Sequence, residues 1–234
     1  MPCVQRYGAV WLWAAQRADV CDQLVRSVTR DRPRCPVSAA ETAAAAVVAV
    51  AVVGFGVYGV ATSAPSTVGY LVSVLVVGGL IVWFRREPLP GALAAALALD
   101  AIAHLAGGLI LIDDEVLYDA SIGPATASLD THLLQYDHLV HGYGSLVATL
   151  TLWVLLVPPE LKDRGRGNLI VLCVLAGMGI GAVNEMIEFV ATLAHHGAHV
   201  GGYTNTGWDL VANAVGALLA AAIIVARRPA AVST

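Results

Sequence analysis

The chain has 234 residues, of which 58% are hydrophobic and only 13% charged, and its mean hydropathy is +0.73. Soluble domains carry about 25% charged residues, so this composition excludes an ordinary soluble protein and predicts an integral membrane protein in a lipid bilayer. The formal net charge is −4 and no basic block alternates with aromatic residues, so nucleic acid is not an expected partner.

The N-terminal region carries six arginines but lacks the apolar core and cleavage site of a signal peptide. We expect residues 1–38 to form a cytoplasmic leader, in which residues 4–28 form an amphipathic helix on the membrane surface. Alternatively, part of this leader lies upstream of the true translation start. The four cysteines show no CxxC spacing, which predicts neither a zinc knuckle nor a disulfide framework.

Six apolar stretches follow, each able to form the roughly 20 helical residues that cross a bilayer. They predict an all-α, polytopic bundle of six transmembrane helices over residues 39–226, followed by a cytoplasmic tail over 227–234. Proline and glycine pairs between the stretches indicate where the helices end. The expected spans are 39–61, 66–84, 90–112, 137–157, 168–193 and 207–226.

The basic residues predict the orientation of the bundle. All 13 lysines and arginines fall in the leader, the second loop, the fourth loop and the tail. Because basic residues are retained on the cytoplasmic side of short loops, both termini should be cytoplasmic and the protein should lie in the inner, cytoplasmic membrane. The third loop is acidic and should face outward.

Ionisable side chains gather in the outer half of this predicted bundle. Asn184, Glu185 and Glu188 are spaced so that a helix places them on one stripe of the fifth span. Such groups are costly at membrane depth and usually face the bundle interior. With a rise of about 1.5 Å per residue, polar residues of three other spans lie at a similar depth. These are Asp100, His104, Asp137, His138, His141, Asp209 and Asn213.

This mixture of imidazole and carboxylate predicts a divalent transition-metal site of Zn, Fe or Mn, because helix bundles build such sites from inward-facing side chains. Glu188 or Asp137 is then the general base beside a metal-bound water. The outer-loop histidines His195, His196 and His199 fit a solvated loop better than a second site. The expected ligands are His104, His141, Glu185 and Asp209, and the expected pocket-lining residues are Asp100, His138, Asn184 and Asn213.

Three functions fit this constellation. The first is a metal-dependent enzyme that acts on a lipid or lipid-linked envelope substrate. The second is a proton- or cation-coupled transporter that uses the same residues as a relay. The third is a structural membrane protein whose polar cluster fixes helix register. Transport needs access from both sides, and apart from Asp100 the inner half has no ionisable group, which favours a one-sided site.

A spacing pattern over residues 90–226 resembles a known family. The series Tyr136-Asp137-x-x-x-His141, Asn184-Glu185-x-x-Glu188 and Thr206-x-x-Asp209-x-x-x-Asn213-x-x-Gly216 resembles the YjdF-like inner-membrane proteins of bacteria and archaea and, more loosely, the VanZ-like proteins. The resemblance implies a compact bundle with these positions facing inward, and no established activity. The VanZ-like proteins are associated with glycopeptide-antibiotic resistance, which implies chemistry at the cell envelope. The family typically carries a further Asp where this chain has Asn205.

Overall fold

The computed structural model describes residues 35–227 except residues 65, 86, 123–133, 159–160, 163–165 and 195–202. The predictions for the leader up to residue 34 and for the tail beyond residue 227 lie outside the described residues. So do those for the loop histidines His195, His196 and His199.

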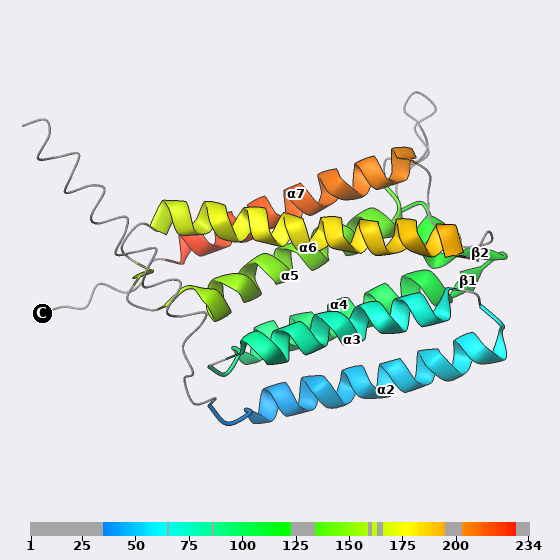
Figure 1. Ribbon diagram of the computed structural model, residues 1–234, viewed down its shortest axis with the longest axis horizontal. Coiled ribbons are helices and arrows are strands. Elements are labelled where there is room, and N and C mark those ends of the chain that lie inside the picture. Colours follow the sequence, from blue (N-terminus) through cyan, green and yellow to red (C-terminus); the bar gives the residue numbers. More distant parts are fainter. Residues whose placement is uncertain are drawn as a thin grey trace, which may run out of the picture.

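Six helices make up most of the described chain, and each is long and apolar enough to span a membrane. They run alternately in opposite directions along the bundle (Figure 1). The all-α, six-span prediction is therefore confirmed. The helices are α2 (Ala39–Ala61), α3 (Thr67–Phe84), α4 (Gly91–Leu109), α5 (Tyr136–Leu156), α6 (Arg166–Ala194) and α7 (Tyr203–Ala226).

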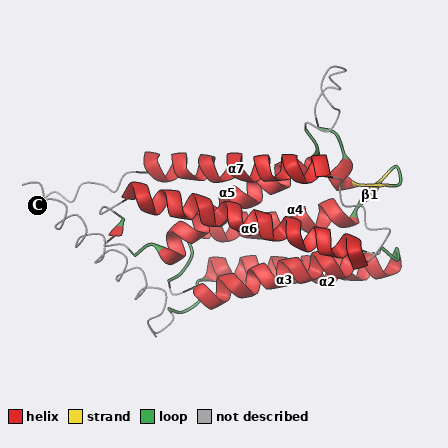
Figure 2. Cartoon of the chain, turned by 45° about the horizontal axis from the view of Figure 1, so that its top comes forward, coloured by secondary structure: helices red, strands yellow, loops and turns green. Residues whose placement is uncertain are grey.

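The two ends of the bundle differ. At one end α2, α4 and α6 begin and α3, α5 and α7 end. We call it the basic end, because the lysine and arginines among the described residues all lie there: Arg85, Lys162, Arg166 and Arg227. At the opposite end a short pair of strands projects from the helices (Figure 2), and we call this the hairpin end. Within the described residues, the basic side chains are thus segregated as the sequence predicts.

The third span is shorter than expected. Helix α4 ends at Leu109, because the residues that follow form the strand β1 (Leu111–Ile112), which pairs with β2 (Glu115–Val116) in an antiparallel hairpin. Asp113 and Asp114 form the turn, with φ of 53° and 68°. Two consecutive residues with positive φ are typical of the tight turns that close two-residue hairpins. Hydropathy alone does not distinguish an apolar strand of this length from a last helical turn.

The fifth and sixth spans are longer than expected. Helix α7 begins at Tyr203 rather than at residue 207, and α6 covers 166–194 rather than 168–193. The apolar pattern marks the part of a helix that lies in hydrocarbon, whereas the backbone hydrogen bonds continue through polar turns on either side. The first turn of α7 therefore includes Asn205.

Helix α5 lies at the centre of the bundle, where it contacts α4, α6 and α7, while α2 packs on α4. Both α5 and α7 run from the hairpin end to the basic end (Figure 1). They approach closely at Gly142 and Gly216, where a Cβ added to Gly216 would overlap the Gly142 carbonyl. Small residues at such a crossing allow two backbones to touch, which is how membrane helices commonly associate.

An aromatic core fills the hairpin end between α3, α4 and α5. Tyr118, in the short 3₁₀ turn η1 (Leu117–Asp119) that follows the hairpin, packs its ring against Gly107, and Tyr70 packs against Gly108. The missing side chains of these two glycines make room for both rings. The buried members of this core are Tyr70, Val74, Leu105, Leu109, Tyr118 and Val140.

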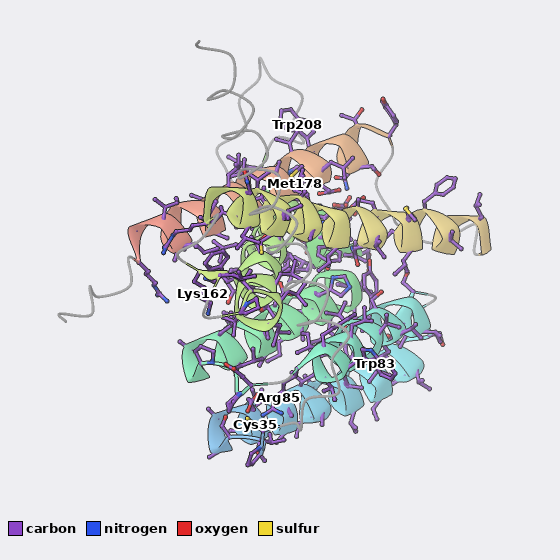
Figure 3. All side chains as sticks on the ribbon, turned by 60° about the vertical axis from the view of Figure 1, so that its left-hand side comes forward. Cys35, Trp83, Arg85, Lys162, Met178 and Trp208 are labelled. Carbon is purple, nitrogen blue, oxygen red and sulfur yellow. The ribbon has the colours of Figure 1, made fainter. Side chains whose placement is uncertain are left out.

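A buried ion pair joins the loops at the basic end. Arg85 donates to Glu41 Oε2 at 3.0 Å and to the carbonyls of Cys35 at 3.1 Å and Pro36 at 2.8 Å, and Figure 3 shows Arg85 beside Cys35. The Leu89 amide also donates to Glu41, at 3.0 Å. The hydrogen bond to Glu41 holds the pKa of the Arg85 guanidinium above its usual value. This network ties the chain before α2 to the loop between α3 and α4.

Candidate metal centre

Three helices bring ionisable side chains together near the hairpin end. Helices α5 and α7 both begin there, so their first turns lie side by side, and α6 ends there. Asp137 and His141, four apart, lie on one face of α5, while Glu185 and Glu188 lie on the stripe of α6 that the sequence predicts. Asp209 of α7 completes the group. We call Asp137, His141, Glu185, Glu188 and Asp209 the carboxylate–histidine cluster.

His141 stands at the centre of the cluster, with carboxylates at both ring nitrogens. Its Nε2 lies 3.2 Å from Asp137 Oδ1 and 4.0 Å from Glu188 Oε1, and its Nδ1 lies 3.2 Å from Glu185 Oε1. Two sets of three residues have ligand atoms within 4.8 Å of one another, Asp137–His141–Asp209 and His141–Glu185–Glu188. This spacing suits a metal ion in either set.

Several atoms of the cluster are buried without a hydrogen bond. Asp209 is fully buried, and its Oδ1, Glu185 Oε1 and His141 Nε2 have no hydrogen-bond partner. The sequence contains no lysine or arginine between residues 87 and 161 or between 167 and 226. A buried carboxylate without a counter-charge costs several kcal/mol. The positive charge that this cluster requires must therefore come from protons or from a bound cation.

Two asparagines hold the carboxylates in place. Asn205 donates from Nδ2 to Asp137 Oδ2 at 2.9 Å and to Asp209 Oδ2 at 2.7 Å. Asn184 donates from Nδ2 to Glu188 Oε1 at 2.6 Å. The sequence predicts Asn184 as a lining residue but does not reveal Asn205 as one, although its position four residues before Asp209 is a local signal. Its bond to α5 depends on how α5 and α7 pack.

His138 lies beside the cluster, with its ring held by a backbone amide. The backbone amide of Gln135 donates to His138 Nδ1 at 3.2 Å, and His138 Nε2 lies 3.8 Å from Asp209 Oδ1. Because Nδ1 accepts, the neutral imidazole carries its hydrogen on Nε2, facing Asp209. His138 therefore lies next to Asp209 of the cluster and is not in a form that ligates a metal through Nε2.

His104, an expected ligand, is placed elsewhere. The hydroxyl of Tyr118 lies 2.7 Å from His104 Nδ1, and the Tyr70 ring meets the imidazole edge-on at 5.2 Å. Burial raises the pKa of the Tyr118 hydroxyl well above its usual value, so this group stays protonated, and it donates to the backbone carbonyl of His104 at 3.1 Å. Within the part of the chain that the structure describes, neither set with metal-binding spacing includes His104. His104 lies on the part of α4 that the sequence predicts, but the side chains around it belong to the aromatic core.

Two further predicted lining residues lie outside the cluster. Asp100 faces Gly144 of α5, where an added Cβ would lie 3.1 Å from the Asp100 carboxylate. Asn213 accepts a hydrogen bond from Ser145 Oγ at 2.8 Å, one turn below Asp209. Both are thus inward-facing, and neither belongs to the two sets with metal-binding spacing that the described residues contain.

Comparison with known proteins agrees with the spacing pattern. A family model described as "Predicted membrane protein (DUF2238)", which is the YjdF-like family, matches residues 41–230, most of the chain. This match gives no support to the looser resemblance to VanZ-like proteins. No curated protein and no solved structure matches the chain. With its six apolar helices and this match, the chain belongs to the DUF2238 family of predicted membrane proteins.

Proposed function

We propose that this protein binds a divalent transition-metal ion in the carboxylate–histidine cluster and acts as a metal-dependent enzyme on a lipid or lipid-linked substrate. The observation that carries the proposal is the convergence of four carboxylates on His141, with buried atoms of Asp209, Glu185 and His141 that make no hydrogen bond. They come from three helices, and no basic side chain of the sequence lies near them in the chain. A cation bound by His141 Nε2 and Asp209 Oδ1 compensates the carboxylates and satisfies these two atoms together.

The distances favour His141 Nε2, Asp137 and Asp209 as the ligands. These three are all buried and form one of the sets with suitable spacing. A metal-binding histidine generally donates its other ring nitrogen to a carboxylate, and Glu185 at 3.2 Å from Nδ1 has that position. This assignment replaces His104 with Asp137 as a ligand and makes Glu185 the group that orients His141. Three protein ligands leave an open position, as in catalytic metal sites.

Glu188 is the best candidate for a general base. Its side chain is 13% exposed, the most accessible of the four carboxylates, and its Oε1 lies 4.0 Å from His141 Nε2. It can therefore accept a proton from a water molecule beside the ligands, and the water oxygen then attacks an ester or amide carbon of the substrate. The bond from that carbon to the leaving alcohol or amine breaks, and the leaving group takes up the proton that Glu188 accepted. Metal-assisted hydrolysis is the reaction class that this arrangement serves best.

The position of the cluster supports an enzyme over a transporter. Along the bundle, Glu41 lies at the basic end and the histidines and other carboxylates of the helices lie toward the hairpin end. Among the described helical residues, Asp100 is the one carboxylate or histidine that lies between these two groups. A proton or cation relay needs further groups to reach the other side. The cluster therefore fits a site that is approached from one face of an inner membrane, within reach of lipid headgroups.

Metal content tests the proposal. Untagged protein, exposed to Mn²⁺, Zn²⁺ or Fe²⁺ and then dialysed, should retain about one ion per chain, and removal of a ligand should lower its metal affinity by more than 100-fold. We expect this loss in His141→Ala and in the isosteric Asp209→Asn, measured by mass spectrometry of the metals. His104→Ala should keep its metal, because its imidazole is bonded to Tyr118. Equal, sub-stoichiometric metal in all four proteins would reject the metalloenzyme and favour the proton relay.

Cysteine labelling tests the orientation. A single cysteine at the exposed Glu115 of the hairpin should react with a membrane-impermeant maleimide in intact cells, because the basic end is retained in the cytoplasm. A protein that keeps only Cys35, which is exposed at the basic end, should react only after the membrane is permeabilised. The reverse pattern would place the cluster on the cytoplasmic side.

A further inference from the structure

Asn205 joins the two aspartates of the cluster across two helices. It lies in the first turn of α7, and its single amide group donates to Asp137 of α5 and to Asp209 one turn along α7. An amide nitrogen carries two hydrogens, and both are used here. Each hydrogen is directed to an Oδ2 atom, so one oxygen of each aspartate is held by the same side chain.

The remaining oxygens face the histidines. Asp137 Oδ1 lies 3.2 Å from His141 Nε2, and Asp209 Oδ1 is buried, has no hydrogen-bond partner and lies 3.8 Å from His138 Nε2. With each Oδ2 atom accepting a hydrogen from Asn205, Oδ1 is the oxygen that each aspartate presents most readily to an ion. Asn205 is thus placed to determine how the two carboxylates bind a cation, without binding it itself.

We propose that Asn205 is a positioning residue that keeps Asp137 and Asp209 monodentate and thereby makes the centre selective for small transition-metal ions over Ca²⁺. This inference rests on the proposed function, since it concerns the same ion. Calcium takes six to eight oxygen ligands, often through bidentate carboxylates, at about 2.3 to 2.6 Å. Zinc and similar ions accept fewer and shorter bonds, of about 2.0 to 2.2 Å to a carboxylate oxygen. A carboxylate that has lost one oxygen to an amide suits the second group of ions.

The amide also prepares the empty centre. With no lysine or arginine nearby in the chain, the two aspartates have only donors such as Asn205 to hold them together before an ion arrives. Groups of this kind around metal ligands are worth about 10- to 100-fold in metal affinity. Removing the amide should therefore weaken binding of the transition metal and free both Oδ2 atoms for calcium.

Titration calorimetry with Zn²⁺ and with Ca²⁺ on the purified full-length chain tests the inference. We expect Asn205→Ala to bind Zn²⁺ about 10- to 100-fold more weakly than the wild type and to show a Zn²⁺ to Ca²⁺ affinity ratio lowered by at least about 10-fold. Asn205→Ser has one hydroxyl, which can donate to one carboxylate at a time, so its metal affinity should lie between those of the wild type and Asn205→Ala. Asn168→Ala is the matched control, because Asn168 is exposed near the start of α6 at the opposite end.

The outcomes separate this inference from the proposed function. A wild type that binds neither ion would reject the metal centre itself. A wild type that binds Zn²⁺, together with an Asn205→Ala variant of the same Zn²⁺ affinity and the same ion preference, would overturn the role of Asn205 and leave the centre standing. Thermal unfolding with EDTA present checks that the variant folds, although the loss of two hydrogen bonds to buried carboxylates should lower its unfolding temperature. If Asn205→Ala does not fold, the comparison is made with Asn205→Ser.

Discussion

Replacing Gly216 with alanine is expected to destabilise the bundle by about 3 kcal/mol and to abolish metal binding, because the new Cβ would overlap the backbone of Gly142 on α5. A backbone carbonyl cannot rotate away as a side chain can, so α5 and α7 must separate. Their separation moves Asp209 away from His141. Thermal unfolding in detergent, followed by circular dichroism, measures the first effect, and metal content measures the second.

Gly207 provides the control on the same helix. It is exposed, and a Cβ added there meets nothing within 4 Å. Gly207→Ala should therefore unfold at or slightly above the wild-type temperature, since alanine is favoured over glycine in a helix by up to about 1 kcal/mol. If both variants behaved alike, helix propensity rather than close packing would govern α7, and the contact between Gly142 and Gly216 would not limit stability.

Replacing Arg85 with alanine is expected to cost about 3 to 5 kcal/mol of stability, because it leaves the buried carboxylate of Glu41 without its counter-charge. The carbonyls of Cys35 and Pro36 lose their donor as well. Arg85→Lys should recover only part of this loss, since an ammonium group lacks the planar set of donors that reaches all three partners. The midpoint of thermal unfolding in detergent gives the comparison.

A double variant separates the ion pair from packing. Arg85→Ala combined with Glu41→Ala should cost less than the two single losses added together, because neither partner is then left charged and buried. Lys162→Ala, at the same end, should have a small effect, as surface charges typically contribute about 1 kcal/mol or less. Additive losses in the double variant would show that Arg85 and Glu41 act independently.

The sequence by itself determined the fold class and most of the cluster. Hydropathy gives the six spans, and helical periodicity places Glu185 and Glu188 of α6 on one stripe and Asp137 and His141 on one face of α5. These properties are local, because a helix turns by the same angle and rises by the same step at each residue wherever it packs. The depth of a side chain and its neighbours one turn away can therefore be read before any contact between helices is known.

Only the tertiary structure decided which side chains meet. Depth does not fix the rotation of a helix about its axis, which depends on interhelical packing such as that of Gly142 against Gly216. His104 has a predicted depth like that of the cluster, yet it bonds to Tyr118, which reaches it because the chain returns to α4 in η1 after the hairpin. Asn205 connects the two aspartates because α5 and α7 begin side by side, a relation between residues 68 positions apart. Such contacts depend on packing over the whole bundle, and no local pattern encodes them.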